Sequence, residues 1–323
     1  MKAIVQDTYG PAEVLELRDV GKPAVGDADL LIRVRAAGLD PGVWHVMTGL
    51  PYLIRALGYG IRAPKDRVRG RAVAGRVEAI GKNVTRFHPG DDVYGTCDGS
   101  FAEYTIARED KLAPKPARLS FNQAAAVPIS APTALQGLRD AGRLRAGQRV
   151  LIIGASGGIG TFAVQLAKAF GAQVTGVCST TKTDLVRRLG AEHVIDYTRE
   201  DFADGSRHYD LILDTAGNRP LAHLRRALTP KGTLVIVGGE NGGKWTGGFQ
   251  RSILAALLSP FVSQQLRMLT SKENSANLRV LEEYFEEGWL TPVIDRTYPL
   301  SEVPKAIQYL DEGHARGKVV ITV

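Results

Sequence analysis

Short runs of alternating apolar and polar residues dominate the first 120 residues of the chain. They cover residues 2–6, 30–36, 73–79 and 101–107, and turns rich in glycine and proline, among them Pro41-Gly42, separate them. A side-chain period of two is typical of half-buried β-strands, and closely spaced turns between such strands are typical of small barrels. The pattern therefore predicts a small, partly open β-barrel in this part of the chain.

Beyond residue 120 the pattern changes to strands that alternate with helices. Helical spacing covers residues 122–127, 134–141, 183–189 and 220–228, and apolar strand-like runs cover 149–153, 173–177, 193–195, 209–214, 232–237 and 266–270. Alternating strands and helices predict an α/β domain with a doubly wound parallel sheet and right-handed crossovers. We expect the outermost strand, 266–270, to pair across the axis of a homodimer.

A glycine-rich turn, Gly154-Ala155-Ser156-Gly157-Gly158-Ile159-Gly160, lies between the strand 149–153 and a helical run that stops at Gly171. Glycines in such a turn allow the backbone to approach a pyrophosphate, and the helix start offers free N–H groups. The alternative is an ordinary tight turn that binds nothing. The intact strand–turn–helix–strand order favours dinucleotide binding.

The end of the chain departs again from the alternating pattern. It predicts an amphipathic helix over 277–287, a second helix capped by Ser301, and a final strand over 318–323. We expect this tail to return to the first domain. The predicted division is therefore residues 1–121 with 272–323 in one domain and residues 122–271 in the other.

Charge and cysteine content narrow the possible functions. The net charge is +7, and the densest basic cluster alternates with apolar residues, which predicts a solvated strand and loop face more than a nucleic-acid site. No apolar run is long enough to span a bilayer, the N-terminus has no signal-peptide pattern, and Cys97 and Cys178 have no metal or redox spacing. A reduced, cytoplasmic setting is expected. The basic cluster consists of Arg62, Lys65, Arg67, Arg69, Arg71 and Arg76.

The residues after the second strand of the dinucleotide unit indicate which nucleotide binds. An acidic residue normally binds the ribose 2′-hydroxyl there, but this chain has no acid before Asp184. Ser179 and Thr180 can donate hydrogen bonds to a 2′-phosphate, and Lys182 supplies positive charge. The pattern favours NADPH, although Lys182 as a solvated residue and Ser179 as a helix cap are the alternative. Tyr197, after the third strand, can approach the same phosphate.

Several segments together resemble the zinc-independent medium-chain dehydrogenase/reductases of the quinone oxidoreductase group. The resemblance covers nearly the whole chain, and segments 155–160 and 177–179 are most similar to the reticulon-4-interacting-protein-like reductases. It implies a GroES-like catalytic domain and a Rossmann NADPH-binding domain. The matching segments are 36–41, 77–81, 83–87, 89–95, 99–104, 124–128, 133–134, 154–168 and 317–320.

The resemblance also implies positions for the cofactor. Thr133 would lie near the nicotinamide, and Gly238 with the loop after it, as well as Lys318, would border the cofactor. The other cofactor-binding positions are Ser156, Gly157, Gly158, Ile159, Ser179, Thr180, Lys182 and Tyr197.

The zinc-ligand positions of the family carry other residues in this chain. Zinc members have cysteine where this chain has Asp40, and Gly-His-Glu where it has Gly70-Arg71-Ala72. Without a thiolate or an imidazole at these points, no catalytic metal is expected. Zinc-free members commonly have asparagine at Asp40 and aspartate at Val43, and many have aspartate at Ala72. A carboxylate at Asp40 would change the charge beside the nicotinamide.

Without zinc, the natural chemistry is delivery of a hydride to a quinone or an α,β-unsaturated carbonyl. Tyr52 is the candidate acid or oxygen-orienting donor, with Asp40 as the second catalytic candidate; the alternative for Tyr52 is that it only lines a pocket. His45 is expected to be a hydrogen-bonded structural residue. A flat apolar substrate site would be shaped by residues for which core packing is the rival interpretation: Trp44, Met47, Tyr59, Trp245 and Phe249.

Other functions remain open at the level of sequence. An enoyl reductase of lipid or polyketide metabolism differs from a quinone or enone reductase only in substrate. A non-catalytic protein of the same fold that binds NADPH or nucleic acid is an alternative of another class.

Overall fold

The computed structural model describes residues 1–239 and 243–323 of the chain. Two compact units divide them: Met1–Pro132 with Glu273–Val323, called here the barrel unit, and Thr133–Lys272, the nucleotide unit. The C-terminal tail thus belongs with the N-terminal segment. The sequence placed residues 122–132 in the second domain, whereas the compact unit that contains them is the barrel unit, because helix α2 (Phe121–Ala125) packs on strands of that unit.

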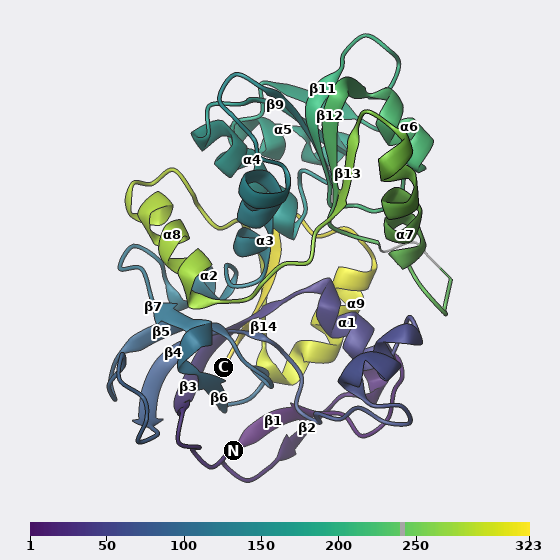
Figure 1. Cartoon of the computed structure of the whole chain (residues 1–323). Coiled ribbons are helices and arrows are strands. Elements are labelled where there is room, and N and C mark those ends of the chain that lie inside the picture. Colours follow the sequence, from purple (N-terminus) through teal and green to yellow (C-terminus); the bar gives the residue numbers. More distant parts are fainter. Residues whose placement is uncertain (240–242) are drawn as a thin grey trace. The chain divides into compact units, whose positions relative to one another are not determined.

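The barrel unit consists mainly of antiparallel strands that form one curved sheet with the order β14-β15-β3-β4-β5-β7, with β6 paired to β3 and a separate β1–β2 hairpin. Figure 1 shows these strands with helices α1, α2, α8 and α9 of the same unit. The strands are β1 (Lys2–Val5), β2 (Glu16–Asp19), β3 (Asp29–Leu39), β4 (Ala72–Ile80), β5 (Asp92–Thr96), β6 (Tyr104–Arg108), β7 (Leu112–Pro114), β14 (Ile294–Pro299) and β15 (Lys318–Thr322).

Helices of the barrel unit begin at residues whose chemistry suits a helix start. α1 (Pro41–Thr48) has proline in its first position, where the missing N–H costs nothing. α2 begins with a capping box in which Ser120 and Gln123 bond each other's backbone N–H groups. α8 (Ser275–Glu286) is capped by the Asn274 side chain. α9 (Val303–Asp311) completes the set.

Two expectations for the barrel unit were wrong in detail. Ser301 does not cap α9, since it lies inside a preceding single turn, Leu300–Glu302, and the helix starts after Glu302 without a side-chain cap. Pro41 and Gly42 were taken as turn residues, but they open α1. Both errors arise because a proline or serine is equally compatible with a turn and with a first helical turn.

The nucleotide unit has the doubly wound parallel sheet that the sequence predicts. The strand order is β10-β9-β8-β11-β12-β13, and every neighbouring pair is parallel. Within this unit, α4 and α5 lie on one side of the sheet and α6 and α7 on the other (Figure 1). The strands are β8 (Arg149–Ile153), β9 (Gln173–Cys178), β10 (His193–Asp196), β11 (Tyr209–Asp214), β12 (Leu228–Ile236) and β13 (Gln265–Met268), and the helices are α4 (Gly158–Ala169), α5 (Thr183–Arg188), α6 (Leu221–Arg226) and α7 (Phe249–Leu258).

Helix α7 was not predicted from the sequence, and the chain between the two units contains a further helix, α3 (Ser130–Gln136). α7 exposes several large apolar side chains, so its sequence lacks the clear two-faced pattern on which helix prediction depends. Within residues 1–239 and 243–323, no helix has the length and apolar content needed to cross a bilayer.

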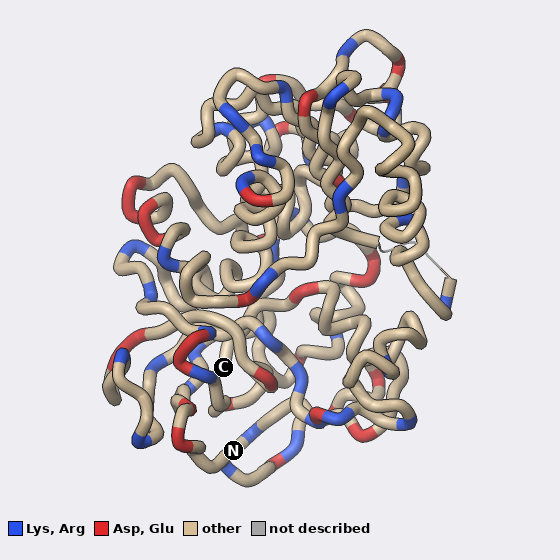
Figure 2. Tube along the Cα trace, viewed as in Figure 1, with Lys and Arg blue, Asp and Glu red and all other residues tan. Residues whose placement is uncertain are grey.

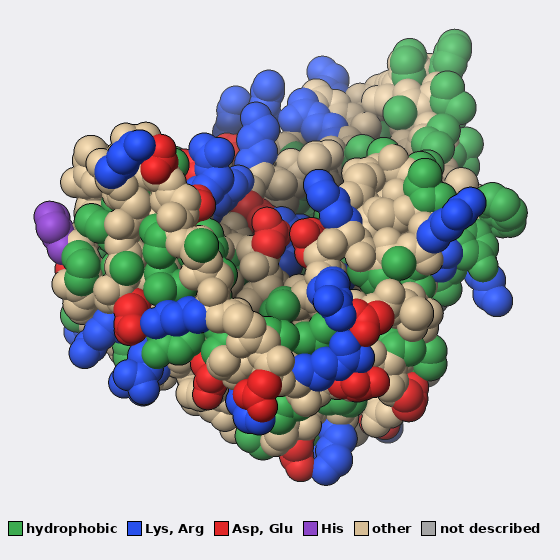
Figure 3. Space-filling view, turned by 90° about the horizontal axis from the view of Figure 1, so that it is seen from below, with side chains coloured by type: hydrophobic (Ala, Val, Ile, Leu, Met, Phe, Trp, Pro, Cys, Tyr) green, Lys and Arg blue, Asp and Glu red, His purple; other side chains and the backbone are tan. Residues whose placement is uncertain are grey.

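The basic cluster is only partly the solvated face that the sequence predicts. Arg62, Lys65, Arg67 and Arg76 are exposed, but Arg71 is half-buried and Arg69 is buried. Basic residues are spread along the traces of both units (Figure 2), and the face seen in Figure 3 mixes basic with acidic side chains. The expectation of a solvated face was therefore wrong for Arg69.

Candidate functional site

The glycine-rich turn connects the end of β8 to the start of α4. Gly154 has a φ of 81°, a conformation that side chains with a Cβ rarely adopt. A Cβ on Gly160 would lie 2.1 Å from the carbonyl oxygen of Gly154. Glycine at these two positions therefore allows the helix to start directly against the turn.

The N-terminus of α4 is open to a ligand. Its N-cap residue is Gly157, which provides no side-chain cap, so the first N–H groups, at Gly158 and Ile159, have no acceptor within the helix. The cap and both of these residues are half-buried, while Ser156 is buried. An anion is stabilised at such a site by free N–H groups and by the helix dipole. The geometry fits the pyrophosphate of a dinucleotide.

The end of β10, which pairs with the carboxyl end of β9, carries an acid that the sequence analysis missed. Asp196, at the end of β10, is in register with Cys178 at the end of β9. Its carboxylate accepts hydrogen bonds from the hydroxyls of Thr180 and Thr198, and these bonds, led by that of Thr180, lower the pKa of Asp196. Parallel pairing of the neighbouring strand was the signal that could have located it. Thr180 is thereby occupied by a protein partner.

Cations surround this end of the sheet. Lys182 is half-buried in the turn before α5, directly after Ser179 and two threonines. The guanidinium of Arg219 lies 5.7 Å from the centre of the Tyr197 ring, which is 49% exposed. Arg219 forms no ion pair with a carboxylate among the described residues, and the sequence analysis missed it. Hydroxyl and cationic groups at one strand end suit a 2′-phosphate.

Two further residues that the sequence predicts to bind the cofactor lie in the nucleotide unit, Thr133 within α3 and Gly238 after β12. Thr133 is buried, and its hydroxyl donates to the hydroxyl of Ser271 at 3.1 Å. Gly238 follows β12, and a Cβ there would lie 2.6 Å from the carbonyl oxygen of Thr215. Part of the loop predicted to follow Gly238 along the cofactor, residues 240–242, lies outside the described residues.

In the barrel unit, Asp40 and Lys318 form a buried ion pair. The Lys318 ammonium donates to Asp40 Oδ1 and, at 3.0 Å, to the carbonyl oxygen of Leu39. Ser130 Oγ donates to the same carboxylate oxygen at 3.2 Å, whereas Asp40 Oδ2 is buried without a partner. The side chains of Asp40 and Lys318 are 8% and 3% exposed. The sequence assigned Asp40 to catalysis and Lys318 to cofactor binding. In the structure these two side chains form an ion pair with each other.

The donor set at the family's zinc-ligand positions does not fit a zinc ion. Asp40 is paired with an ammonium group, and Arg71 presents a cation whose Nη2 donates to Glu273 Oε2 at 2.8 Å. Among residues 1–239 and 243–323, no group of three histidine, cysteine or acidic side chains is arranged to hold a metal. Zinc requires deprotonated nitrogen, sulfur or carboxylate ligands without a competing cation.

Tyr52 lies on an exposed segment between α1 and β4. Its side chain is 37% exposed, and the Arg55 guanidinium lies 4.8 Å from its ring centre and 4.3 Å from that of Tyr9. Tyr59 is half-buried, and its carbonyl accepts a hydrogen bond from the Tyr9 hydroxyl at 2.8 Å. The segment therefore gathers three tyrosines and one guanidinium.

The remaining predicted pocket residues differ in their surroundings. Met47 is 1% exposed and belongs to the core of the barrel unit, against which the half-buried Trp44 also packs. Trp245 and Phe249, in the nucleotide unit, are 76% and 40% exposed. His45 bonds the carbonyl of Leu50 through Nδ1 at 2.8 Å, as its structural interpretation predicted. Core packing is thus clear for Met47 and Trp44.

Family models match two parts of the chain: an alcohol dehydrogenase GroES-like domain over residues 26–117 and a zinc-binding dehydrogenase over residues 189–321. The chain is 33% identical over 355 residues to the mouse mitochondrial NAD(P)H oxidoreductase RTN4IP1, covering 100% of this chain and 89% of the relative. It is 34% identical over 336 residues to the chloroplastic NADPH-dependent alkenal/one oxidoreductase of Arabidopsis thaliana, covering 99% and 79%.

A solved structure, that of the quinone oxidoreductase from Coxiella burnetii, matches with a TM-score of 0.89 at 31% identity, covering 100% of this chain and 99% of that one. These likenesses extend over both units. They agree with the free N-terminus of α4 after the glycine turn and with the order of the parallel sheet. The chain belongs to the medium-chain dehydrogenase/reductase superfamily, in the group that contains the quinone oxidoreductases and enone reductases.

Proposed function

We propose that this protein is an NADPH-dependent, zinc-independent oxidoreductase that reduces quinones or α,β-unsaturated carbonyl compounds. The observation that carries the proposal is the buried Asp40–Lys318 ion pair, which stands where a zinc-ligating cysteine would be needed. The printed names of its relatives, an alkenal/one oxidoreductase and a quinone oxidoreductase, support this substrate class.

The nucleotide unit supplies the cofactor site of the proposal. The N–H groups at Gly158 and Ile159 bind the pyrophosphate, and Lys182 with Ser179 binds the 2′-phosphate. Arg219, stacked on Tyr197, adds a second cation at the same end of the sheet. Bound NADPH supplies the hydride. Thr133 and Gly238 are the residues proposed to border the nicotinamide.

The barrel unit supplies the substrate residues. Tyr52 is the proposed donor to the carbonyl oxygen, since a phenol O–H can donate a hydrogen bond and the residue is 37% exposed. Asp40 acts as a positioning residue: its carboxylate fixes the Lys318 ammonium beside the carbonyl of Leu39, at the start of α1. Tyr59 is a proposed apolar wall of the substrate site, and the proton reaches the product from Tyr52 or water.

A homodimer and a cytoplasmic location complete the proposal. β13 pairs only with β12 among the described strands, and Ile253, Leu257 and Phe261 follow each other at four-residue spacing with exposures of 57%, 66% and 85%. An unpaired strand edge beside an apolar helix face suits a second copy of the chain. Sedimentation at equilibrium would show a single monomeric species if this part of the proposal is wrong.

An assay of NADPH consumption with a panel of quinones, enones, ketones and alcohols tests the activity. We expect turnover of quinones or enones that is unchanged by a chelator, and a loss of roughly tenfold in kcat for Tyr52→Phe, the loss typical of one proton donor or hydrogen bond. Activity confined to alcohols, or activity abolished by the chelator, would contradict the proposal. Tight NADPH binding without any turnover would favour a non-catalytic nucleotide-binding protein.

An enoyl reductase of lipid or polyketide metabolism is the second candidate, and it differs only in substrate. The same panel separates the two if it includes thioester-linked enoyl groups. No nucleic-acid partner is proposed, because Arg67, Arg71 and Arg76 of the basic cluster are paired with carboxylates of the chain.

A further inference from the structure

A segment of the barrel unit between α1 and β4, residues 52–67, exposes most of its side chains. Large apolar side chains are among them: Leu53 is 40% exposed, Leu57 64% and Ile61 76%. Single exposed apolar side chains are common on protein surfaces, but several in so short a stretch indicate a surface that contacts another molecule.

Hydrogen bonds hold segment 52–67 in place on the barrel unit. The Tyr9 hydroxyl donates to the carbonyl of Tyr59 at 2.8 Å. The backbone N–H of Lys65 donates to the same carbonyl at 2.9 Å, which closes the loop 60–64 that carries Ile61. The apolar side chains are therefore presented by a hydrogen-bonded backbone.

Basic residues accompany the apolar ones in this segment. Arg67 bonds Asp7, and Arg55 bonds backbone carbonyls. Arg62 and Lys65 are exposed, and neither forms an ion pair with a carboxylate of the described residues. Positive charge without a counter-ion thus lies next to the exposed apolar side chains. The charged residues of the segment are Arg55, Arg62, Lys65, Asp66 and Arg67.

The exposed face of α7 has a different composition. Its apolar residues Ile253, Leu254 and Leu257 are exposed, but the helix has a single charged residue, Arg251, which bonds the buried Asp214. A face without free charge suits a second copy of the chain. Apolar side chains beside unpaired cations are instead typical of a surface that lies on an anionic bilayer.

We propose that segment 52–67 is a docking surface for an anionic lipid bilayer. Charge complementarity identifies the occupant, because Arg62 and Lys65 attract anionic headgroups. Leu57 and Ile61 enter the boundary between the headgroups and the acyl chains, where their apolar surface leaves water. Nucleic acid suits the segment less well, since single-stranded nucleic acids stack their bases on aromatic residues and offer no apolar layer to aliphatic ones.

Docking would bring the proposed substrate residues to the lipid surface. Tyr52, the proposed donor, and Tyr59 both belong to segment 52–67. A lipophilic quinone or enone would then reach Tyr52 from the bilayer. This consequence rests on the proposed function, whereas the docking itself does not.

Vesicle sedimentation measures the docking without any turnover, so docking and reductase activity can fail separately. The full chain is mixed with vesicles of phosphatidylcholine alone or of phosphatidylcholine with phosphatidylglycerol. We expect binding to the anionic vesicles to be roughly tenfold tighter or more, and to weaken as salt is added. Equal binding to both kinds of vesicle, or binding to a short DNA duplex but to neither vesicle, would overturn the proposal.

Two double variants each remove one contribution to docking. Leu57→Ser/Ile61→Ser removes apolar surface, and Arg62→Gln/Lys65→Gln removes charge. Each should weaken binding to the anionic vesicles by roughly tenfold or more, because one contribution alone gives only marginal attachment. Unchanged binding in either double variant would contradict the assignment.

Matched controls lie elsewhere on the barrel unit. Leu17, on β2, is 42% exposed, and the Lys305 side chain, on α9, is 68% exposed. Leu17→Ser and Lys305→Gln should bind the anionic vesicles as the wild type does. A loss in these controls equal to that of the double variants would mean that docking is not specific to segment 52–67.

A fluorescent label locates the contact while the fold stays intact. Both native cysteines, Cys97 and Cys178, are buried, so an environment-sensitive dye can be attached selectively to Leu57→Cys or to Leu17→Cys. On anionic vesicles we expect a blue shift of the emission for the dye on Leu57→Cys and none for the dye on Leu17→Cys. A shift for both, or for neither, would overturn the proposal.

Discussion

Charged groups are arranged differently at the strand ends of the nucleotide unit and in the interior of the barrel unit. In the nucleotide unit, Lys182 follows β9, is half-buried, and lies close in sequence to the hydroxyls of Ser179 and Thr180. In the barrel unit, Asp40, Lys318 and Arg69 are buried, and the paired groups are 278 residues apart in the chain. The role of an exposed charge beside a motif can be inferred from the neighbouring sequence. The role of a buried charge depends on the residue with which the fold pairs it.

Exposed and buried ion pairs also differ in their contribution to the free energy of unfolding. Exposed ion pairs contribute little to stability. A buried pair loses several kcal/mol if one member is removed, because the other remains uncompensated. The Asp40–Lys318 pair of the barrel unit and the Arg251–Asp214 pair of the nucleotide unit, whose side chains are 17% and 0% exposed, are both buried pairs of this kind.

The largest expected effect follows from removing one member of the buried pair. Lys318→Met leaves the Asp40 carboxylate buried without a counter-charge and should lower the free energy of unfolding by about 3–5 kcal/mol, measured by urea denaturation. The double variant Asp40→Leu/Lys318→Met should recover most of this loss. A double variant as unstable as Lys318→Met would contradict the contrast between the units.

A matched control lies on the surface of the same unit. Lys305 forms an exposed ion pair with Glu302, and its side chain is 68% exposed. Lys305→Met should change the free energy of unfolding by no more than about 0.5 kcal/mol.

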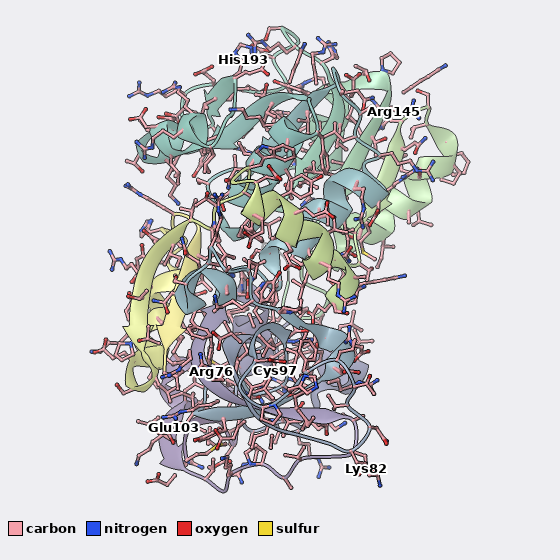
Figure 4. All side chains as sticks on the ribbon, turned by 90° about the vertical axis from the view of Figure 1, so that its left-hand side faces the viewer. Arg76, Lys82, Cys97, Glu103, Arg145 and His193 are labelled. Carbon is pink, nitrogen blue, oxygen red and sulfur yellow. The ribbon has the colours of Figure 1, made fainter. Side chains whose placement is uncertain are left out.

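The two cysteines provide one probe in each unit. Burial raises the pKa of Cys97 to about 12 and that of Cys178 to about 11, and Figure 4 shows Cys97 among the strands of the barrel unit. Because the thiolate is the reactive form, alkylation at pH 8 should be about a hundredfold slower for Cys178 than for an exposed thiol, and slower still for Cys97. Both rates should rise as the pH approaches these pKa values.

Mass spectrometry after a timed exposure to iodoacetamide gives both rates, with the urea-unfolded chain as reference. NADPH should slow alkylation of Cys178, at the end of β9, and leave Cys97 unchanged. Equal protection of both thiols would mean that the nucleotide stabilises the whole chain and does not act at the end of β9.

The smallest expected effect concerns the 2′-phosphate. Lys182→Ala should weaken NADPH binding by about tenfold, or about 1–2 kcal/mol, and leave NADH binding unchanged, because only the phosphate contact is lost. Lys231→Ala, an exposed lysine on β12, serves as the control. A loss shared equally by both nucleotides would place Lys182 elsewhere in the cofactor site, and unchanged NADPH binding would leave Arg219 as the phosphate ligand.

Most of the fold was predictable from the sequence, and the exceptions share a cause. The parallel sheet, the return of the tail to the first unit and most strands follow from hydrophobic periodicity. Helix α7 was missed because its exposed apolar residues obscure the pattern, and the start of α1 was taken as a turn because proline suits both. In each case the local preference is compatible with two structures, and packing selects between them.

For the candidate site, the sequence determined the glycine turn, the strand–helix order around it and the cluster Ser179–Lys182, because neighbours along the chain make these features. Tertiary structure alone decided that Asp196 lies beside Thr180, that Asp40 is paired with Lys318, and that Arg69 is buried without a counter-ion. Each of these depends on which distant residue the fold brings into contact and on how much water it excludes. The pattern of residues along the chain specifies neither the distant contact partner nor the amount of water excluded.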